Sequence, residues 1–132
     1  MKRIVLVAVL VAVTVAGIDW LADLTQDRPD RVAPGSRSEV VLEVRVRNSF
    51  DPAPLIRAQG LWGACESTVH QRLIEPGLVE LGAGRFLAVT EPALGEHAWR
   101  RLQGCLEDLT IDRLHGHVVS KTDMGPAEPA AS

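Results

Sequence analysis

The chain has 132 residues, of which 46% are hydrophobic and 23% charged, and its 17 acidic and 14 basic side chains give a formal net charge of -3. This length leaves room for one small domain and excludes a multidomain enzyme. The acidic excess excludes a typical nucleic-acid-binding domain, because contacts with phosphates need a clustered positive surface. We therefore expect a packed core and no nucleic-acid partner, since the apolar fraction is too high for global disorder.

The first residues are typical of a segment that enters a membrane. Lys2 and Arg3 precede an uncharged apolar run over residues 4–18. A basic start before an apolar run keeps the amino terminus in the cytoplasm and sends the following chain across the membrane. We expect residues 1–22 to form a membrane anchor or a signal peptide, with membrane contact through residues 4–22.

Two fates of this segment stay open, and a third is disfavoured. At 1.5 Å per residue the apolar run covers about 22 Å of a hydrocarbon layer roughly 30 Å thick, so an uncleaved anchor needs an extension through Trp20, Leu21 and Leu24. A cleaved signal peptide fits the small residues around Ala16 and Gly17 and yields a secreted domain. A buried core helix is disfavoured because the run is rich in β-branched valine and has no polar face.

The rest of the chain divides into a linker, a domain and a tail. Residues 23–38 mix charges with two prolines and a glycine, a composition typical of a linker. Residues 39–122 carry the periodic patterns of a folded α+β domain. Residues 123–132 are rich in small side chains, and we expect them to form a disordered tail.

The domain opens with a strand and a helix. Apolar and polar side chains alternate over residues 39–47, which predicts a half-buried strand. Asp51 and Pro52 follow, a pair suited to the cap and first position of a helix. Apolar residues at helical spacing come next, and Cys65 is one of them.

A hairpin is the clearest local signal. Residues 72–81 and 85–91 predict two strands, and the glycine-rich turn at 82–84 joins them. Proline cannot donate to a central ladder, so Pro76 makes the first of these an edge strand or a bulged one.

A second helix and a final strand complete the domain. Apolar residues at helical spacing, Cys105 among them, predict a helix within 97–111, and residues 114–121 alternate as a strand. The element order predicts a ferredoxin-like βαββαβ fold, in which right-handed crossovers put both helices on one face of a four-stranded antiparallel sheet. A fold this common does not by itself identify a function.

Cys65 and Cys105 are the only two cysteines, and both follow the export segment. Disulfides persist outside the cytoplasm, so we expect a bond between them. Antiparallel helices oppose this expectation, because both residues come late in their helices and would lie about 10 Å too far apart. Two buried free thiols are the alternative, and the absence of a C-x-x-C spacing excludes a redox-active pair.

One face of the predicted sheet gathers basic side chains. Strand alternation places six of them on the face that the helices leave open: Arg45, Arg47, Arg113, His115, His117 and Lys121. Such a face on an otherwise acidic domain suits an anionic partner. We expect this partner to be an envelope protein, an envelope polymer or a lipid headgroup.

His115 and His117 also have the spacing of a metal-binding pair. Their imidazoles lie about 7 Å apart on one face of a strand, as in zinc or copper sites that take a third ligand from elsewhere. Cationic neighbours make a metal unfavourable there, so a solvated face with cross-strand ion pairs is the preferred interpretation. We expect no metal and no cofactor.

No catalytic motif is present in the sequence. It contains no G-x-S-x-G elbow, no H-E-x-x-H pair and no phosphate-binding glycine loop, because the turn at 82–84 is followed by a strand. Glu107 and Asp108 are neighbours on a predicted helix, where a solvated surface is their expected role. We therefore expect a protein that is not an enzyme.

Most of the 14 basic residues are arginines and tyrosine is absent, as in chains from high-GC bacteria. The stretches DRPDRVAPGSRSEVVLEVRVR, LWGACESTV and RRLQGCLEDLTIDR resemble small uncharacterised exported or membrane-anchored proteins of actinobacteria. This resemblance implies an extracytoplasmic location and no assigned activity. A membrane anchor before a βαββαβ module is also similar, in architecture only, to peptidoglycan-binding SPOR domains.

These features together predict a single-pass membrane protein whose small domain lies outside the cytoplasm and serves in binding or in envelope structure. A secreted form of the same domain is the alternative. A metal-binding protein that uses His115 and His117 is a further alternative.

Overall fold

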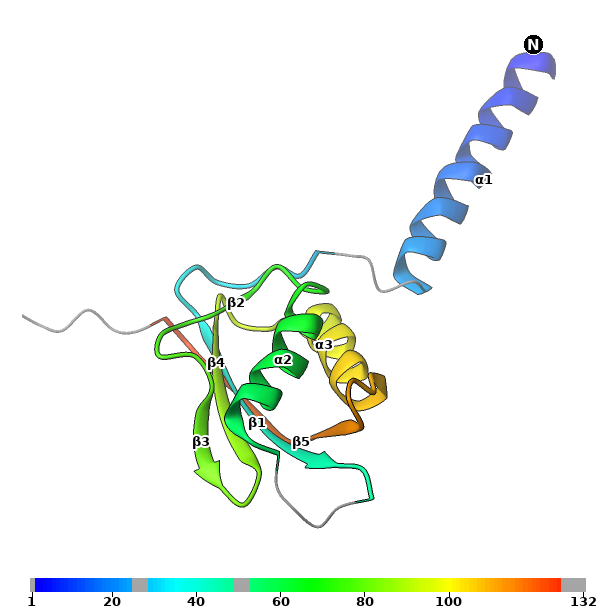
Figure 1. Cartoon of the computed structure of the whole chain (residues 1–132). Coiled ribbons are helices and arrows are strands. Elements are labelled where there is room, and N and C mark those ends of the chain that lie inside the picture. The colour runs from blue at the N-terminus through cyan, green and yellow to red at the C-terminus, as the bar shows by residue number, and fades with distance from the viewer. Residues whose placement is uncertain (1, 25–28, 49–52, 127–132) are drawn as a thin grey trace, which may run out of the picture.

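A computed structural model describes residues 2–24, 29–48 and 53–126 (Figure 1). In chain order its elements are α1 (Lys2–Leu24), β1 (Arg37–Val46), α2 (Leu55–Glu66), β2 (Arg72–Leu73), β3 (Val79–Gly82), β4 (Arg85–Glu91), α3 (Glu96–Asp108) and β5 (Leu114–Met124). The α+β class and the antiparallel sheet are confirmed. The expected helix cap at Asp51 and Pro52 and the tail beyond Pro126 lie outside the described residues.

Helix α1 is apolar and exposed over residues 4–21. Its segment Ile4–Leu21 has a mean hydropathy of 2.5, and none of it is buried. The helix has 23 residues and is therefore about 35 Å long, enough to cross a hydrocarbon layer roughly 30 Å thick. Its one hydroxyl, on Thr14, donates to the Leu10 carbonyl at 2.9 Å. The helix is long and apolar enough to span a membrane or to serve as a signal sequence, and its exposure excludes a core helix.

The sheet has five strands where the sequence predicts four. Its order is β2-β4-β1-β5, and β3 pairs with the same edge of β4 as β2 does. The expected strand over residues 72–81 is thus broken in two. Gly77, at φ 91°, donates to the Ile74 carbonyl at 2.9 Å and closes a turn around Pro76, which has no amide hydrogen for the ladder.

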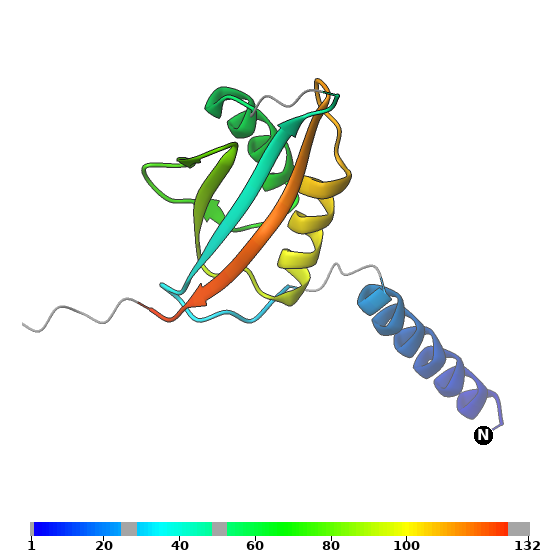
Figure 2. The same ribbon diagram turned by 90° about the horizontal axis from the view of Figure 1, so that it is seen from below.

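Helices α2 and α3 both pack on one face of this sheet. Alternate residues of β1, among them Val40 and Leu42, are fully buried and join Phe86 of β4 in a core with both helices. Helix α2 contributes Ala58, Leu61, Trp62 and Cys65 to this core, and α3 contributes Ala98, Leu102 and Leu106. Figure 2 shows β1 and β5 side by side with α3 along them.

The last turn of α3 lies directly on β5. A Cβ atom at Gly116 would lie 2.5 Å from the Leu106 carbonyl oxygen and 3.0 Å from a methyl group of Leu61. Only glycine leaves room for this contact. At Gly60 in α2, by contrast, nothing lies within 4 Å of the position of a Cβ.

A bulge in β5 moves Lys121 to the helix side of the sheet. The register shifts between Leu42, which pairs with Val118, and Val41, which pairs with Ser120, so Val119 is the extra residue. Lys121 consequently pairs with the buried Val40. Its Nζ lies 5.7 Å from the ring centroid of Trp99, and its side chain is 17% exposed. The expected place of Lys121 on the open face is therefore wrong.

Part of the expected linker belongs to the folded domain. Asp30 accepts hydrogen bonds from the backbone N–H groups of His97 and Ala98, at 3.1 and 2.7 Å, and so caps the amino end of α3. The residue at the cap position of α3 itself is Gly95, which has no capping side chain. Ser38, now inside β1, accepts a hydrogen bond from the Leu94 N–H at 2.8 Å. The domain therefore begins before residue 39, and β5 extends it to Met124.

The segments before β1 and after β5 lie together. The position of a Cβ on Gly35 is 3.8 Å from the Cβ of Pro126. Ser38 of β1 also donates a hydrogen bond to the Asp123 carboxylate of β5. The chain therefore reaches the sheet and leaves it at the same end.

The expected disulfide between Cys65 and Cys105 is present. The S–S distance is 2.03 Å and the Cα atoms are 5.6 Å apart. The expectation that the two cysteines lie too far apart is wrong, because it assumed antiparallel helices that place Cys65 opposite the early part of α3. Helix α2 ends at Glu66, one residue after Cys65, and the bond joins the carboxyl-terminal parts of the two helices.

Candidate functional site

Four of the six residues of the expected basic face gather near one end of the sheet. Arg45 pairs with His115 across β1 and β5, and the neighbouring His117 pairs with Glu43. Arg47 follows β1, and its N–H donates to the Arg113 carbonyl at 2.6 Å.

The other two predicted residues do not join this group in the same way. Arg113 lies in the turn before β5 at φ 65°, outside the strand alternation that the prediction assumed. Lys121 lies on the helix side. The six basic residues therefore do not form one continuous face.

The open face is also less basic than the sequence suggested, because carboxylates lie among its arginines. Glu43 forms ion pairs with Arg45 and with Arg85 of β4, the second at 3.4 Å. The hydrogen bond from Arg45 holds the pKa of Glu43 below its ordinary value, and Arg85 acts in the same direction against partial desolvation. Arg45 is thus already paired with a carboxylate of the sheet.

Glu107 at the end of α3 has a structural role. Its carboxylate accepts a hydrogen bond from the Val118 N–H at 3.3 Å and lies 3.5 Å from Nδ1 of His117. It therefore ties the last turn of α3 to β5. Across the described ranges, no group of three or more His, Cys, Asp or Glu side chains is arranged to hold a metal ion, so nothing adds a third ligand to His115 and His117.

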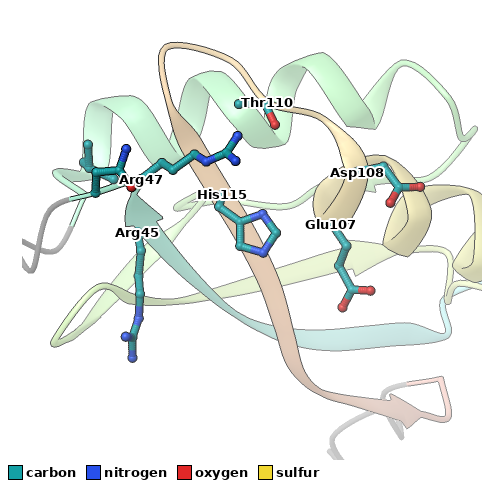
Figure 3. Close-up of a pocket in the computed structure, with 8 residues that line it drawn as sticks. Arg45, Arg47, Glu107, Asp108, Thr110 and His115 are labelled. Carbon is teal, nitrogen blue, oxygen red and sulfur yellow. The ribbon is translucent and has the colours of Figure 1, made fainter.

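A cavity of about 580 Å³ lies where the end of β1, the end of α3 and the start of β5 meet (Figure 3). Its lining residues are Arg45, Val46, Arg47, Asn48, Glu107, Asp108, Thr110 and His115. In Figure 3, His115 lies between the arginines and the two carboxylates, and the Arg45 guanidinium points away from His115. The volume falls within the range of small-molecule sites, about 300–1,000 Å³.

Two charged side chains of this cavity have no partner within the described part of the chain. Arg47 and Asp108 form no side-chain hydrogen bond or ion pair there, with each other or with another described residue. Arg45 and Glu107, by contrast, are engaged with Glu43 and with β5. Within the described ranges, the cavity thus offers Arg47 as a cation and Asp108 as an anion without a side-chain partner.

The sequence pointed to Arg45, Arg47 and His115 but missed the acidic half of this cavity. The sequence pattern predicted that Glu107 and Asp108 form part of a solvated helix surface. The signal that could have found them is topological: α3 runs antiparallel to β5, so its end lies beside the start of β5 and the end of β1.

Comparisons with known proteins give no match to this chain among family models, curated proteins or solved structures.

Proposed function

We propose that this chain is a single-pass membrane protein whose small domain lies outside the cytoplasm and acts as a binding module of the cell envelope. The exposed apolar segment Ile4–Leu21 of helix α1, which follows the basic residues Lys2 and Arg3, carries this proposal. The Cys65–Cys105 bond supports the same location, because disulfides persist outside the cytoplasm. The resemblance to exported actinobacterial proteins points the same way.

We also propose a ferredoxin-like arrangement for the domain. Strands β2 and β3 act as one interrupted edge strand of β4, and both helices cover one face of the sheet. If the pair is counted once, the strand order agrees with the βαββαβ interpretation. The likeness to SPOR domains remains one of architecture, and it adds no ligand.

The tether to α1 supports an outward-facing cavity. Six residue steps join Leu24 to Asp30, which is at most about 21 Å of extended chain. Asp30 is fixed to the amino end of α3, so that end stays close to the membrane surface. The cavity lies at the other end of α3, which has 13 residues and is therefore about 20 Å long.

This geometry favours some of the expected partners over others. A cavity at the far end of the domain meets molecules in the space beyond the membrane, such as an envelope protein or polymer, more readily than headgroups of its own lipid layer. We propose binding without catalysis, and without a metal or cofactor. Metal binding through His115 and His117 finds no further support.

Labelling of introduced cysteines in intact cells tests the location of the domain. Ser120→Cys is on an exposed strand position, and Thr14→Cys, in the middle of α1, is the matched control. A membrane-impermeant maleimide is expected to label the first variant in intact cells and the second only after detergent extraction. Labelling of Ser120→Cys only in broken cells would overturn the proposal.

Mass spectrometry separates the anchored form from the secreted alternative. The anchored protein keeps residues 1–24 and sediments with membranes after carbonate washing. A mature chain that begins near Gly17 and is found in the medium would establish the secreted form instead. Alkylation without reductant tests the disulfide in the same sample, and two reactive thiols would contradict its extracytoplasmic role.

A further inference from the structure

We infer that the cavity at the end of β1 and α3 binds a small zwitterion, with the free amino and carboxyl groups of a short peptide as the matching chemistry. This inference deepens the proposed binding function and rests on it. It differs from the anionic partner that the sequence suggested.

The charges that line the cavity argue against a simple anion site. Two arginines and two carboxylates are among its lining residues, so cationic and anionic side chains are present in equal number. A phosphate or sulfate there would meet carboxylates as well as guanidinium groups. A ligand with both charges would meet a complement for each.

Arg47 and Asp108, which have no side-chain partner among the described residues, indicate how the ligand is oriented in the cavity. Arg47 presents a planar guanidinium, which binds a carboxylate through two parallel hydrogen bonds. Asp108 presents a carboxylate that has no partner among the described residues and that can accept hydrogen bonds from an ammonium group. Their side chains come from different elements, one after β1 and one at the end of α3, and no ion pair joins them within the described residues.

The carboxyl-terminal end of α3 carries a negative potential that favours a cation. A helix carboxyl end carries a partial negative charge from its last carbonyl groups, and basic side chains normally offset it. Helix α3 instead ends with Glu107 and Asp108 and has no basic residue in its last turn. A ligand ammonium group placed here would interact favourably with Asp108 and with these carbonyl groups.

The remaining lining residues add polar contacts and a spectroscopic probe. Thr110 offers a hydroxyl group, and Asn48 offers an amide at the same rim. His115 is exposed, and in Figure 3 it lies between Arg47 and the carboxylates. Its ring signals in an NMR spectrum therefore report directly on occupation of the cavity.

The test uses the full chain in lipid nanodiscs and trialanine as the probe. Saturable movement of the His115 ring signals is expected with trialanine. N-acetyl-trialanine lacks the ammonium group and trialanine amide lacks the carboxylate, and each is expected to bind about tenfold more weakly, the effect of losing one charged contact.

Variants that remove one charge assign each end of the peptide. Asp108→Asn is expected to remove the preference for trialanine over its acetylated form and to leave the preference over the amide. Arg47→Gln is expected to remove the preference for trialanine over its amide and to leave the preference over the acetylated form. Arg57→Gln on α2 and Glu80→Gln on β3 remove exposed charges outside the cavity and are expected to change neither preference.

Three results would overturn the inference. These are equal binding of trialanine and its doubly blocked form, tighter binding of inorganic phosphate than of trialanine, and no saturable movement of the His115 signals. The maleimide labelling described above is independent of all three, so failure of peptide binding leaves the proposed membrane location standing. Failure of that location would in turn not alter the peptide titration.

Discussion

Reduction of the Cys65–Cys105 bond is expected to remove a large part of the stability of the domain. The bond closes a loop of 40 residues. In the chain-entropy model, a loop of this length destabilises the unfolded state by about 4 kcal/mol at 25 °C. For a domain of 60–100 residues, each kcal/mol corresponds to about 4–8 °C in Tm, so the expected decrease is about 16–32 °C.

The measurement compares oxidised and reduced wild-type chain in the same nanodiscs. Urea unfolding is followed by tryptophan fluorescence, to which Trp62 contributes a buried chromophore that is only 2% exposed in the folded state. The reduced protein keeps both sulfur atoms, so the difference reports the cross-link and not lost packing. The Cys65→Ala/Cys105→Ala variant is expected to lose slightly more, because Cys65 is fully buried. A difference below about 1 kcal/mol between oxidised and reduced protein would refute the reasoning.

Three further predictions concern packing, capping and pH. Gly116→Ala is expected to destabilise the domain by about 1–3 kcal/mol because its Cβ would meet a helix carbonyl, whereas Gly60→Ala, which meets nothing, is expected to stabilise it by about 0.5–1 kcal/mol; urea midpoints that move together would contradict this. Asp30→Ala is expected to cost about 1 kcal/mol and to speed amide exchange in the first turn of α3, and unchanged exchange there would argue against the cap. Burial works to raise the pKa of Asp123, but hydrogen bonds from two neighbours hold it below its ordinary value, and the pKa of Glu43 is also lowered. Both groups therefore stabilise the fold above their ordinary pKa, and this stability is lost as pH falls through the lowered values; Glu43→Gln and Asp123→Asn are expected to flatten the acid limb of an unfolding-against-pH curve, and an unchanged limb would contradict the assignment.

The local features of the fold were predictable because their signals are local. Side chains of a strand alternate with a period of two, so residues 39–47 revealed the first strand and its buried face. Glycines at 82 and 84 revealed the hairpin, since both adopt positive φ values there. Pro76 revealed the interruption of the edge strand, although not that two separate strands result.

The extra residue Val119 in β5 explains why the predicted position of Lys121 on the binding face was wrong. Alternation from His115 places Lys121 on the same side, but the bulge at Val119 reverses the side of every residue after it. A bulge depends on the pairing of two strands that are far apart in sequence. Nothing in the residues around Val119 reveals it.

Long-range contacts explain the other differences. Asp30 caps a helix that starts 66 residues later, and it resembles any other acidic residue in a proline-containing segment. The disulfide was predictable from the expected extracytoplasmic location, but its geometry depended on how α2 meets α3. The acidic half of the cavity, with Glu107 and Asp108, likewise depended on where α3 ends relative to β1.

The contact between Gly35 and Pro126 has a practical consequence for tagging and display. Any sequence attached after Pro126 emerges beside the segment that leads to α1, on the side of the domain away from the cavity. A tag fused directly after Pro126 would therefore leave the mouth of the cavity unobstructed, and in the anchored form that we propose it would lie on the membrane side of the domain. Surface immobilisation through such a tag would present the cavity to the solution in the orientation proposed for the cell.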